Sequence, residues 1–311
     1  MLGNLKKKEM ADFSQTRDFL DISDLSKLEL RAILAKSTEL KSLLKKSGHP
    51  KYLEGKQLAM IFEKNSTRTR VSFEVGINQL GGNAILITNK DSQIGRGEPI
   101  IDTAKVLSRY VDIMMMRTFD HSALKELAEH ASVPVINGLT DFSHPCQIMA
   151  DIMAIEEHIG NIESKVVAWV GDVNNVCRSW IHAAEKFSFE LRISSPKHYA
   201  GDIPQSHFVK YCENPVDAVK DADVITTDTW VSMGDEIETD KKKKALKAYQ
   251  VNKKLVAGAK DNFVFLHCLP AHRGEEVTSD IIDGKNSIIY DEAENRLHIQ
   301  KAIMLWCFGI I

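Results

Sequence analysis

The chain has 311 residues, of which 43% are hydrophobic and 27% are charged, so it can bury a sizeable core and should not be disordered. Its 40 Lys and Arg residues against 43 Asp and Glu residues give a net charge of −3, which argues against bulk capture of nucleic acid or of an anionic membrane. No apolar run reaches the ~18 residues of a membrane span, and the basic start at 1–13 lacks the apolar segment of a signal peptide. Five scattered cysteines without a CxxC pair favour reduced thiols, so we expect a soluble protein of the cytoplasm.

Apolar, β-branched runs alternate with amphipathic stretches along the chain, which is the pattern of strands alternating with helices. Leucine and isoleucine recur at helical spacing from Leu25 to Leu44, and Gly48 with Pro50 ends this first helix. Further helices are predicted from Ser66 to Gly81, near 100–110 and 121–131, from His144 to about Ile159, and at 175–187. The apolar runs predict strands at 57–62, 83–88, 112–118, 133–138, 165–171, 191–195, 223–227 and 263–268.

Helices that connect successive strands indicate parallel sheets covered on both faces. The rhythm restarts near residue 160, after the helix 144–159, and no Ser-, Gly- or Pro-rich linker separates the two halves. The sequence therefore predicts an α/β fold with two domains, each a parallel sheet flanked by helices, joined by long interdomain helices. The basic run Lys241–Lys244 follows several acidic residues and is interpreted as a solvated helix face.

The strongest local signal is the stretch Ser66–Arg70, with the sequence STRTR, between a predicted strand and the helix after it. Ser66 is a good N-cap, and the free N–H groups of a helix start attract anions. Hydroxyls and two guanidiniums in the same five residues add the forked donors and positive charge that a phosphate binds. The alternative is an ordinary capped helix with two surface arginines, but capping needs only one of these residues. The stretch favours an anion site.

Two further stretches open predicted helices. Gly171–Asn175 follows a strand but lacks the second and third glycines of the GxGxxG fingerprint, so a nicotinamide enzyme is the weaker interpretation. Its two asparagines suit a small polar ligand, or they simply cap a helix. In the HPCQ stretch, His144 can donate to a carbonyl oxygen and Gln147, one turn on, can reach the same ligand. A capping or core histidine is the alternative.

Two late loops also follow predicted strands. Asp228–Gly234 places a carboxylate and a hydroxyl four residues apart, which suits an ammonium group, although it is also the sequence of a turn that ends in Gly234. His267–Pro270 ends another strand, so Cys268 is expected at the carboxyl edge, where open α/β sheets bind ligands. A buried small thiol is the alternative for Cys268.

Together these segments resemble the aspartate/ornithine carbamoyltransferase family, on STRTR at 66–70, MRTF at 116–119, HPCQ at 144–147, GDxNN at 171–175, DxxxSMG at 228–234 and HCLP at 267–270. The last two look like its ornithine-using members, since an aspartate-using member would lack the SMG loop. The resemblance runs from about residue 13 to the C-terminus. Its small departures are Arg178, where a smaller polar residue is more usual, and the short tail after Arg296.

The resemblance implies transfer of a carbamoyl group from carbamoyl phosphate to the δ-amine of L-ornithine, giving L-citrulline and phosphate in arginine metabolism. It assigns residues 1–146, with a C-terminal helix 297–311, to carbamoyl phosphate and residues 147–296 to L-ornithine. The residues it implies for carbamoyl phosphate are Ser66, Thr67, Arg68, Thr69, Gln93, Arg117, His144, Gln147, Cys268, Leu269 and Arg296. Those for L-ornithine are Asn175, Asp228, Ser232 and Met233. Catalytic roles are implied for Arg117, His144, Cys268 and Asp228.

The implied chemistry needs no side-chain nucleophile and no metal or organic cofactor, and pairs such as His267 with Cys268 lack the usual metal-ligand spacing. An alkylamine has an ordinary pKa of about 10.4, so the site must select the neutral amine, which nearby arginines favour. Attack of the amine on the carbamoyl carbonyl makes an oxyanion, which Arg117, Thr69 and His144 would stabilise. The resemblance also implies a homotrimer with shared active sites, in which Gln93 contributes to the site of a neighbouring subunit.

Two alternatives stay open. One is a carbamoyltransferase for a related amine such as putrescine or an acylated ornithine; Asp228, Ser232 and Met233 argue against putrescine, which has no α-amino acid end. The other is a non-catalytic regulator that binds an anion or an amino acid, which would not need a carbonyl-polarising His144 and Arg117. No nucleic acid or membrane partner is expected.

Overall fold

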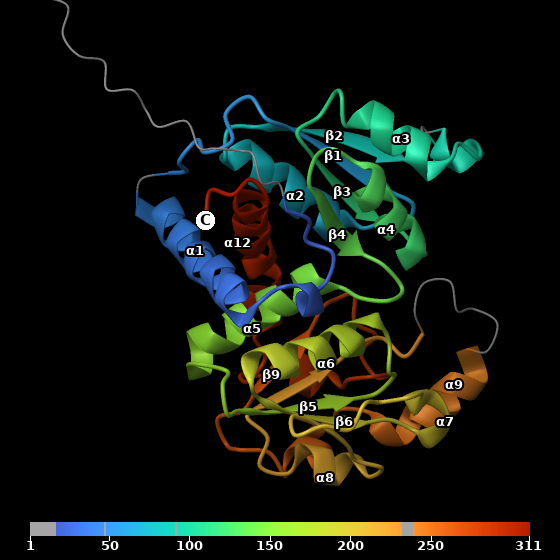
Figure 1. The fold of residues 1–311 in the computed structure, drawn as a ribbon. Coiled ribbons are helices and arrows are strands. Elements are labelled where there is room, and N and C mark those ends of the chain that lie inside the picture. Colours follow the sequence, from blue (N-terminus) through green and yellow to red (C-terminus); the bar gives the residue numbers. More distant parts are fainter. Residues whose placement is uncertain (1–16, 47, 91–92, 232–238) are drawn as a thin grey trace, which may run out of the picture.

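The two halves of the chain fold as two α/β domains, one above the other in Figure 1. The computed structural model describes residues 17–46, 48–90, 93–231 and 239–311. Each domain is built on a parallel sheet with helices on its faces, so the predicted fold class is confirmed. Within the described ranges no helix has the length and apolar character needed to cross a membrane.

The first sheet has the strand order β2 (Asn83–Thr88), β1 (Gln57–Phe62), β3 (Ile113–Arg117), β4 (Val135–Leu139), with every pair parallel. The second has the order β7 (Val209–Tyr211), β6 (Glu190–Ser194), β5 (Val166–Val170), β8 (Val224–Thr227), β9 (Val264–His267), again all parallel. The carboxyl ends of parallel strands share one edge of a sheet, so the loops that follow them gather there.

The helices complete the two domains. The longer ones are α1 (Lys27–Lys46), α2 (Thr67–Gln79), α3 (Ile100–Leu107), α4 (His121–His130), α5 (Pro145–Ile159), α6 (Asn175–Phe187), α9 (Thr239–Leu246) and α12 (Ile289–Cys307). The short ones are α7 (Lys197–Ala200), α8 (Pro215–Val219), α10 (Lys253–Val256) and α11 (Ser279–Ile282). Single 3₁₀ turns lie at Ile22–Asp24, Ile94–Arg96 and Lys247–Tyr249.

Helices on both faces explain why central strands such as β1 and β5 are almost wholly apolar, whereas β6, nearer the edge, alternates. In β1, Leu58 and Met60 belong to the large core that also contains residues of α2, α5 and α12. Their neighbours Ala59 and Ile61 pack in a separate cluster with residues of α3 and α4. A strand buried on both sides needs apolar side chains at every position.

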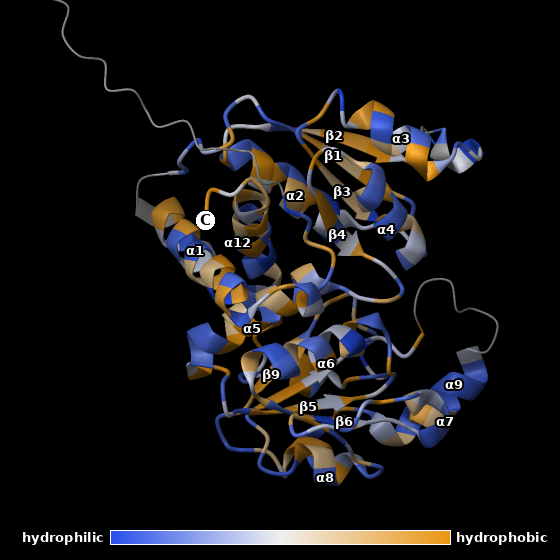
Figure 2. Ribbon diagram, viewed as in Figure 1, coloured by the Kyte–Doolittle hydropathy of each residue, from blue (hydrophilic) through white to orange (hydrophobic). Residues whose placement is uncertain are grey.

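One core joins the two domains. In Figure 1 the helix α5 lies between the two domains, and α12 runs from it into the upper domain beside α1 and α2. The largest buried cluster contains residues of both helices together with Met60 of the first sheet and Trp169 of the second. Figure 2 shows the strands as largely hydrophobic and the outer helix α9 as hydrophilic. The predicted connection through long helices is confirmed.

The last long helix, α12, runs from Ile289 to Cys307 and so contains Arg296 in its interior. The division at 296/297 that the resemblance implies therefore falls within one helix. The helices α1, α2 and α5 pack around it and bury polar side chains such as His298 and Gln300. From Asn295 to Cys307 nearly every residue is buried, polar ones included, so this part of the helix has no amphipathic pattern.

The sequence does not predict the strand β7 or the short helices α7, α8, α10 and α11, because three to five residues are too few for a periodic signal. One local prediction needs correction. The run Lys241–Lys244 is not a wholly solvated face, because Lys242 Nζ lies 2.7 Å from Asp172 Oδ2, with the two side chains only 14% and 8% exposed. Lys243 pairs with Glu275 at 2.6 Å.

Candidate active site

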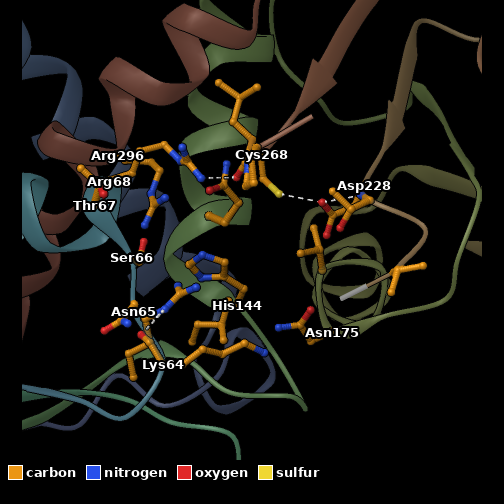
Figure 3. A pocket seen from close by; sticks show the side chains of 18 of the residues that line it. Lys64, Asn65, Ser66, Thr67, Arg68, His144, Asn175, Asp228, Cys268 and Arg296 are labelled. Carbon is orange, nitrogen blue, oxygen red and sulfur yellow. Dashed lines mark hydrogen bonds between the residues drawn. The ribbon is translucent and has the colours of Figure 1, made fainter. Parts of the chain in front are cut away.

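The loops at the carboxyl ends of both sheets meet in a cavity of about 380 Å³ (Figure 3). Strands β1 and β3 lead to it from the first domain, and β5, β8 and β9 from the second. The structure therefore brings together side chains from both domains. The predicted site residues that line the cavity are Ser66, Thr67, Arg68, Arg117, His144, Gln147, Asn175, Asp228, Cys268, Leu269 and Arg296.

Helix α2 begins at the cavity with the predicted cap. The Ser66 hydroxyl accepts a hydrogen bond from the backbone N–H of Thr69 at 3.2 Å. Arg68 is half-buried, and its Nη2 donates to the carbonyl oxygen of Leu269 at 2.7 Å, which links the two domains. Arg70 is exposed and lies 3.7 Å from Glu74. Only one of the two guanidiniums in this stretch is therefore at the site.

Two further guanidiniums reach the site from distant parts of the chain, Arg117 from the end of β3 and Arg296 from α12. Both donate to the hydroxyl of Thr69, Arg117 Nη1 at 3.3 Å and Arg296 Nη2 at 2.7 Å. Arg117 Nε also donates to the carbonyl oxygen of Lys64 at 3.2 Å. Thr69 is fully buried and does not itself line the cavity. One threonine hydroxyl thus holds two buried arginines in place.

The arginine cluster, defined as Arg68, Arg117 and Arg296, is not neutralised by carboxylates. Across the described residues none of the three forms an ion pair, whereas the neighbouring Lys64 pairs with Asp141 at 2.9 Å. Burial, followed by the charge of Arg296, lowers the pKa of Arg117 to about 10, and burial also lowers the pKa of Arg296. Buried charge without a counter-ion is costly, so the cluster favours a bound anion.

His144 and Gln147 face the cavity from the start of α5. The Nδ1 atom of His144 and the Oε1 atom of Gln147 are both buried, without a hydrogen-bond partner in the described part of the chain. Burial, together with the charges of Arg296 and Arg117, holds the pKa of His144 well below its usual range. The imidazole is therefore neutral at pH 7 and can donate one N–H to an oxygen atom without adding charge.

The second domain contributes an acidic group to the opposite wall. Cys268 Sγ donates to Asp228 Oδ1 at 3.2 Å (Figure 3), and Asn174 Nδ2 donates to Asp228 Oδ2 at 2.7 Å. Burial, and then the charge of Asp228, raises the pKa of the Cys268 thiol well above its usual range. The thiol is protonated at neutral pH and is not an activated nucleophile. The fixed carboxylate of Asp228 is suited to accept N–H groups of an amine.

A metal centre is not favoured by these residues. Ligand atoms of Asp228, His267 and Cys268 lie within 4.8 Å of one another. However, His267 Nδ1 accepts from the backbone N–H of Leu269 at 3.0 Å, and His267 Nε2 lies 3.1 Å from a carboxylate oxygen of Glu276. Both ring nitrogens are therefore occupied, and a protonated thiol is a poor metal ligand.

One predicted site residue lies elsewhere: Gln93 is exposed and does not line the cavity of its own chain. Ser232 and Met233 lie outside the described residues, so their predicted role is not tested. Lys64 lines the cavity although sequence reasoning did not single it out, and its place as the second residue after β1 could have marked it. Asn174 is one of the two asparagines considered for a small polar ligand, but its side chain bonds to Asp228, a contact that depends on the pairing of β5 with β8.

Two family models match nearly the whole chain. Residues 17–157 match the aspartate/ornithine carbamoyltransferase carbamoyl-P binding domain, and residues 163–307 match the Asp/Orn binding domain of the same family. Arg68 and Arg117 lie in the segment that matches the first model. Arg296, Asp228 and Cys268 lie in the segment that matches the second.

Close relatives and solved structures agree with these matches. The chain is 54% identical to an ornithine carbamoyltransferase of Rhodopseudomonas palustris over 307 residues, covering 95% of this chain and 98% of the relative. It is 56% identical to one of Nitrobacter winogradskyi over 301 residues, covering 94% and 97%. Its fold is similar to that of a solved ornithine carbamoyltransferase of Pyrococcus furiosus, with a TM-score of 0.90 and 47% identity, covering 95% of this chain and 98% of the other. It is also similar to a solved ornithine carbamoyltransferase of Burkholderia thailandensis, with a TM-score of 0.87 and 45% identity, covering 94% of this chain and 98% of the other.

Proposed function

Because the chain belongs to the aspartate/ornithine carbamoyltransferase family, we propose that it transfers the carbamoyl group of carbamoyl phosphate to the δ-amine of L-ornithine, giving L-citrulline and phosphate. One observation carries the proposal. One cavity joins an arginine cluster, which forms no ion pair within the described ranges, to a carboxylate–thiol pair on the other domain. The first group suits a phosphate, and the second suits an amine.

In this proposal the phosphate binds at the start of α2. The N–H groups of Thr67 and its neighbours, the Ser66 hydroxyl and the helix dipole attract it. Arg68 supplies two parallel charge-assisted donors, for which it leaves the carbonyl oxygen of Leu269. That oxygen then becomes free to accept an N–H of the carbamoyl group, with Gln147 as a second acceptor.

Arg117, His144 and Thr69 polarise the carbonyl bond and stabilise the oxyanion that forms when the amine attacks. The neutral imidazole of His144 donates an N–H, and Arg117 bridges the carbonyl and phosphate oxygens. Thr69 acts from behind the cavity wall, where its hydroxyl bonds to Arg117 and Arg296. Donors fixed in place before the reaction stabilise the transition state more than mobile water does.

The amine must lose its proton before it attacks, and a free alkylamine has a pKa of about 10.4. The positive charges of the arginine cluster disfavour the ammonium form, while Asp228 accepts N–H groups of the neutral amine. Cys268 lies beside the reacting groups as a neutral thiol. The α-amino acid end is assigned to Asn175, Ser232 and Met233.

We assign carbamoyl phosphate binding to residues 1–146 with 297–311 and L-ornithine binding to residues 147–296. Both divisions fall inside helices, the first in α5 and the second in α12, which pack against each other. Arg296 and Gln147 lie at these divisions and line the cavity, so a movement of one domain relative to the other would shift both side chains. We place the reaction within arginine metabolism in the cytoplasm.

We further propose a homotrimer in which Gln93 reaches the carbamoyl phosphate site of the adjacent subunit. A second cavity of about 360 Å³ between α2 and α12 supports this assembly, and Thr67, Arg68 and Arg296 line both cavities. The side chains of Val71 and Val75 in it are 52% and 37% exposed. An apolar groove that opens beside the site suits contact with a neighbouring subunit.

A colorimetric citrulline assay tests the proposed function. With carbamoyl phosphate, the purified protein should form a ureido product from L-ornithine and much less from putrescine or N-acetylornithine. A preference for either of those amines would favour the related transferases. If both substrates bind in calorimetry and no product forms, the protein is a binding regulator and the proposal is wrong.

A further inference from the structure

Two buried carboxyl groups surround the amide of Gln147 on the side away from the cavity. Gln147 Nε2 donates to Asp151 Oδ1 at 2.8 Å, one turn along α5, and to Glu292 Oε1 at 2.7 Å on α12. Asp151 and Glu292 are 2% and 1% exposed. Neither residue lines the cavity, and neither has a role in the transfer described above.

These contacts determine which end of the amide faces the cavity. Only the NH₂ end can donate to two carboxyl oxygens, so the hydrogen-bond network assigns that end to Asp151 and Glu292. Both N–H bonds are then used. The Oε1 atom is left at the cavity, where it is buried and has no partner among the described residues. Gln147 therefore presents an acceptor and no donor to whatever binds there.

The carboxyl pair is itself held by its surroundings. Glu292 Oε2 accepts the backbone N–H of His267 at 3.0 Å, which ties α12 to the end of β9. Burial raises the pKa of Asp151 to about 7 and raises that of Glu292 well above its usual range, and the two carboxyls hydrogen-bond to each other. The facing charges are Arg296, which favours ionisation, and Asp228, which opposes it. Together the two carboxyls retain a proton near neutral pH.

We propose that Asp151 and Glu292 are positioning residues that hold the Gln147 amide with its oxygen toward the cavity, so that the site selects a transferred group with N–H donors over one of the same shape without them. This inference rests on the proposed function, and it identifies what distinguishes a carbamoyl group from an acetyl group. The two differ by an NH₂ in place of a methyl. A methyl group leaves the buried oxygen of Gln147 without a partner, which is the usual origin of strong discrimination.

The test compares the dissociation constants of carbamoyl phosphate and acetyl phosphate, measured by calorimetry without L-ornithine. The ratio of the two constants should fall about tenfold in Asp151→Leu, the loss expected for one hydrogen bond. Asp151→Asn is the matched control, because its amide oxygen still accepts from Gln147 and its NH₂ can donate to Glu292; its ratio should stay near that of the wild type. Glu292→Met, on the other helix, removes the second acceptor and should also lower the ratio.

The outcomes separate this inference from the proposed function. General damage to the site would weaken both phosphates alike and leave the ratio unchanged, and this result in a folded Asp151→Leu protein overturns the positioning role. Failure of both acceptor-free variants to fold, with Asp151→Asn folded, would assign the pair to structure alone and also overturn it. If the wild-type protein neither binds carbamoyl phosphate nor forms citrulline, the proposed function itself is wrong.

Discussion

Arg68, Arg117 and Arg296 differ in how firmly the folded chain holds them. Arg117 and Arg296 are buried and bond to Thr69 inside the protein. Arg68 is half-buried, and its guanidinium bonds to the carbonyl oxygen of Leu269 across the cavity. Arg68 is therefore the arginine that can turn toward a ligand, and it can be removed with the least damage to the core.

Arg68→Ala should weaken carbamoyl phosphate binding about a hundredfold, because two charge-assisted hydrogen bonds at about 1.5 kcal/mol each are lost. Arg68→Lys should restore little of this affinity, since an ammonium group cannot supply the fork. Calorimetric titration measures both constants, and circular dichroism checks that the variants remain folded. Unchanged affinity in a folded Arg68→Ala protein would remove Arg68 from the phosphate site.

Neutral His144 has a consequence for stability at acid pH. Its pKa in the folded chain lies well below the unfolded value of about 6.5. As the pH falls below about 6.5, the unfolded chain takes up a proton that the folded chain does not. His144 therefore lowers the unfolding free energy as the pH falls below about 6.5. Above that pH the group is neutral in both states and does not change the unfolding free energy.

His144→Gln should flatten this pH dependence. Between pH 6 and pH 5 the wild-type protein should lose about 1 kcal/mol more unfolding free energy than the variant, because one proton of linkage amounts to about 1.4 kcal/mol per pH unit. Urea denaturation at both pH values gives the two differences. Parallel curves for the two proteins would mean that the imidazole is already protonated in the folded state.

At the scale of single elements, helix α9 is anchored to the second domain by its lysines. Lys242 pairs with the buried Asp172, which directly follows β5 and Gly171, and Lys243 pairs with Glu275. Asp172 belongs to the same loop as Asn174, which holds the carboxylate of Asp228. The lysines of α9 therefore stabilise a loop that forms part of the active site.

Lys242→Met should lower the unfolding free energy by about 2 kcal/mol, less than the 3–5 kcal/mol typical of fully buried pairs because both side chains are slightly exposed. Lys244→Met is the matched control: it makes the same change on an exposed position of the same helix and should stay within about 0.5 kcal/mol of the wild type. Urea denaturation compares the two variants. Equal losses would mean that the pair with Asp172 contributes nothing specific.

At the scale of the whole molecule, the active-site cavity adjoins the second cavity, which lies between α2 and α12. Arg68 and Arg296 line both cavities, so a chain seated in the groove would lie against the proposed phosphate site. Gln93 is exposed and outside the cavity of its own chain, as a residue that serves a neighbour would be. The proposed trimer connects these two observations.

Mixing two inactive variants tests whether sites are shared. At a carbamoyl phosphate concentration near the wild-type dissociation constant, Gln93→Ala and Arg68→Ala should each show almost no activity alone. Mixed trimers contain interfaces at which an intact Arg68 meets an intact Gln93. Citrulline formation should partly return after subunit exchange, which mass spectrometry of differently tagged chains verifies. If exchange is complete and the mixture stays inactive, Gln93 acts within its own chain or not at all.

Local pattern alone determined much of this protein. Apolar runs such as 57–62 and 166–170 mark strands because helices bury both faces of each sheet, and the connecting helices require parallel pairing. Ser66 was identifiable as a cap from its place between a strand and a helix. Cys268 was expected at the carboxyl edge because it directly follows a strand.

Only the tertiary structure decided how these parts meet. Arg296 bonds to Thr69 across 227 positions, and no local signal marks Arg296, because nearly every residue of α12 from Asn295 onward is buried and the polar ones among them break the amphipathic pattern. Arg70 and Arg68 are equivalent in the sequence, yet their positions on α2 send one to the surface and the other to the site. The hydrogen bonds from Gln147 to Asp151 and Glu292 link α5 and α12, which are far apart in the chain. Such contacts depend on packing, which a single sequence does not display.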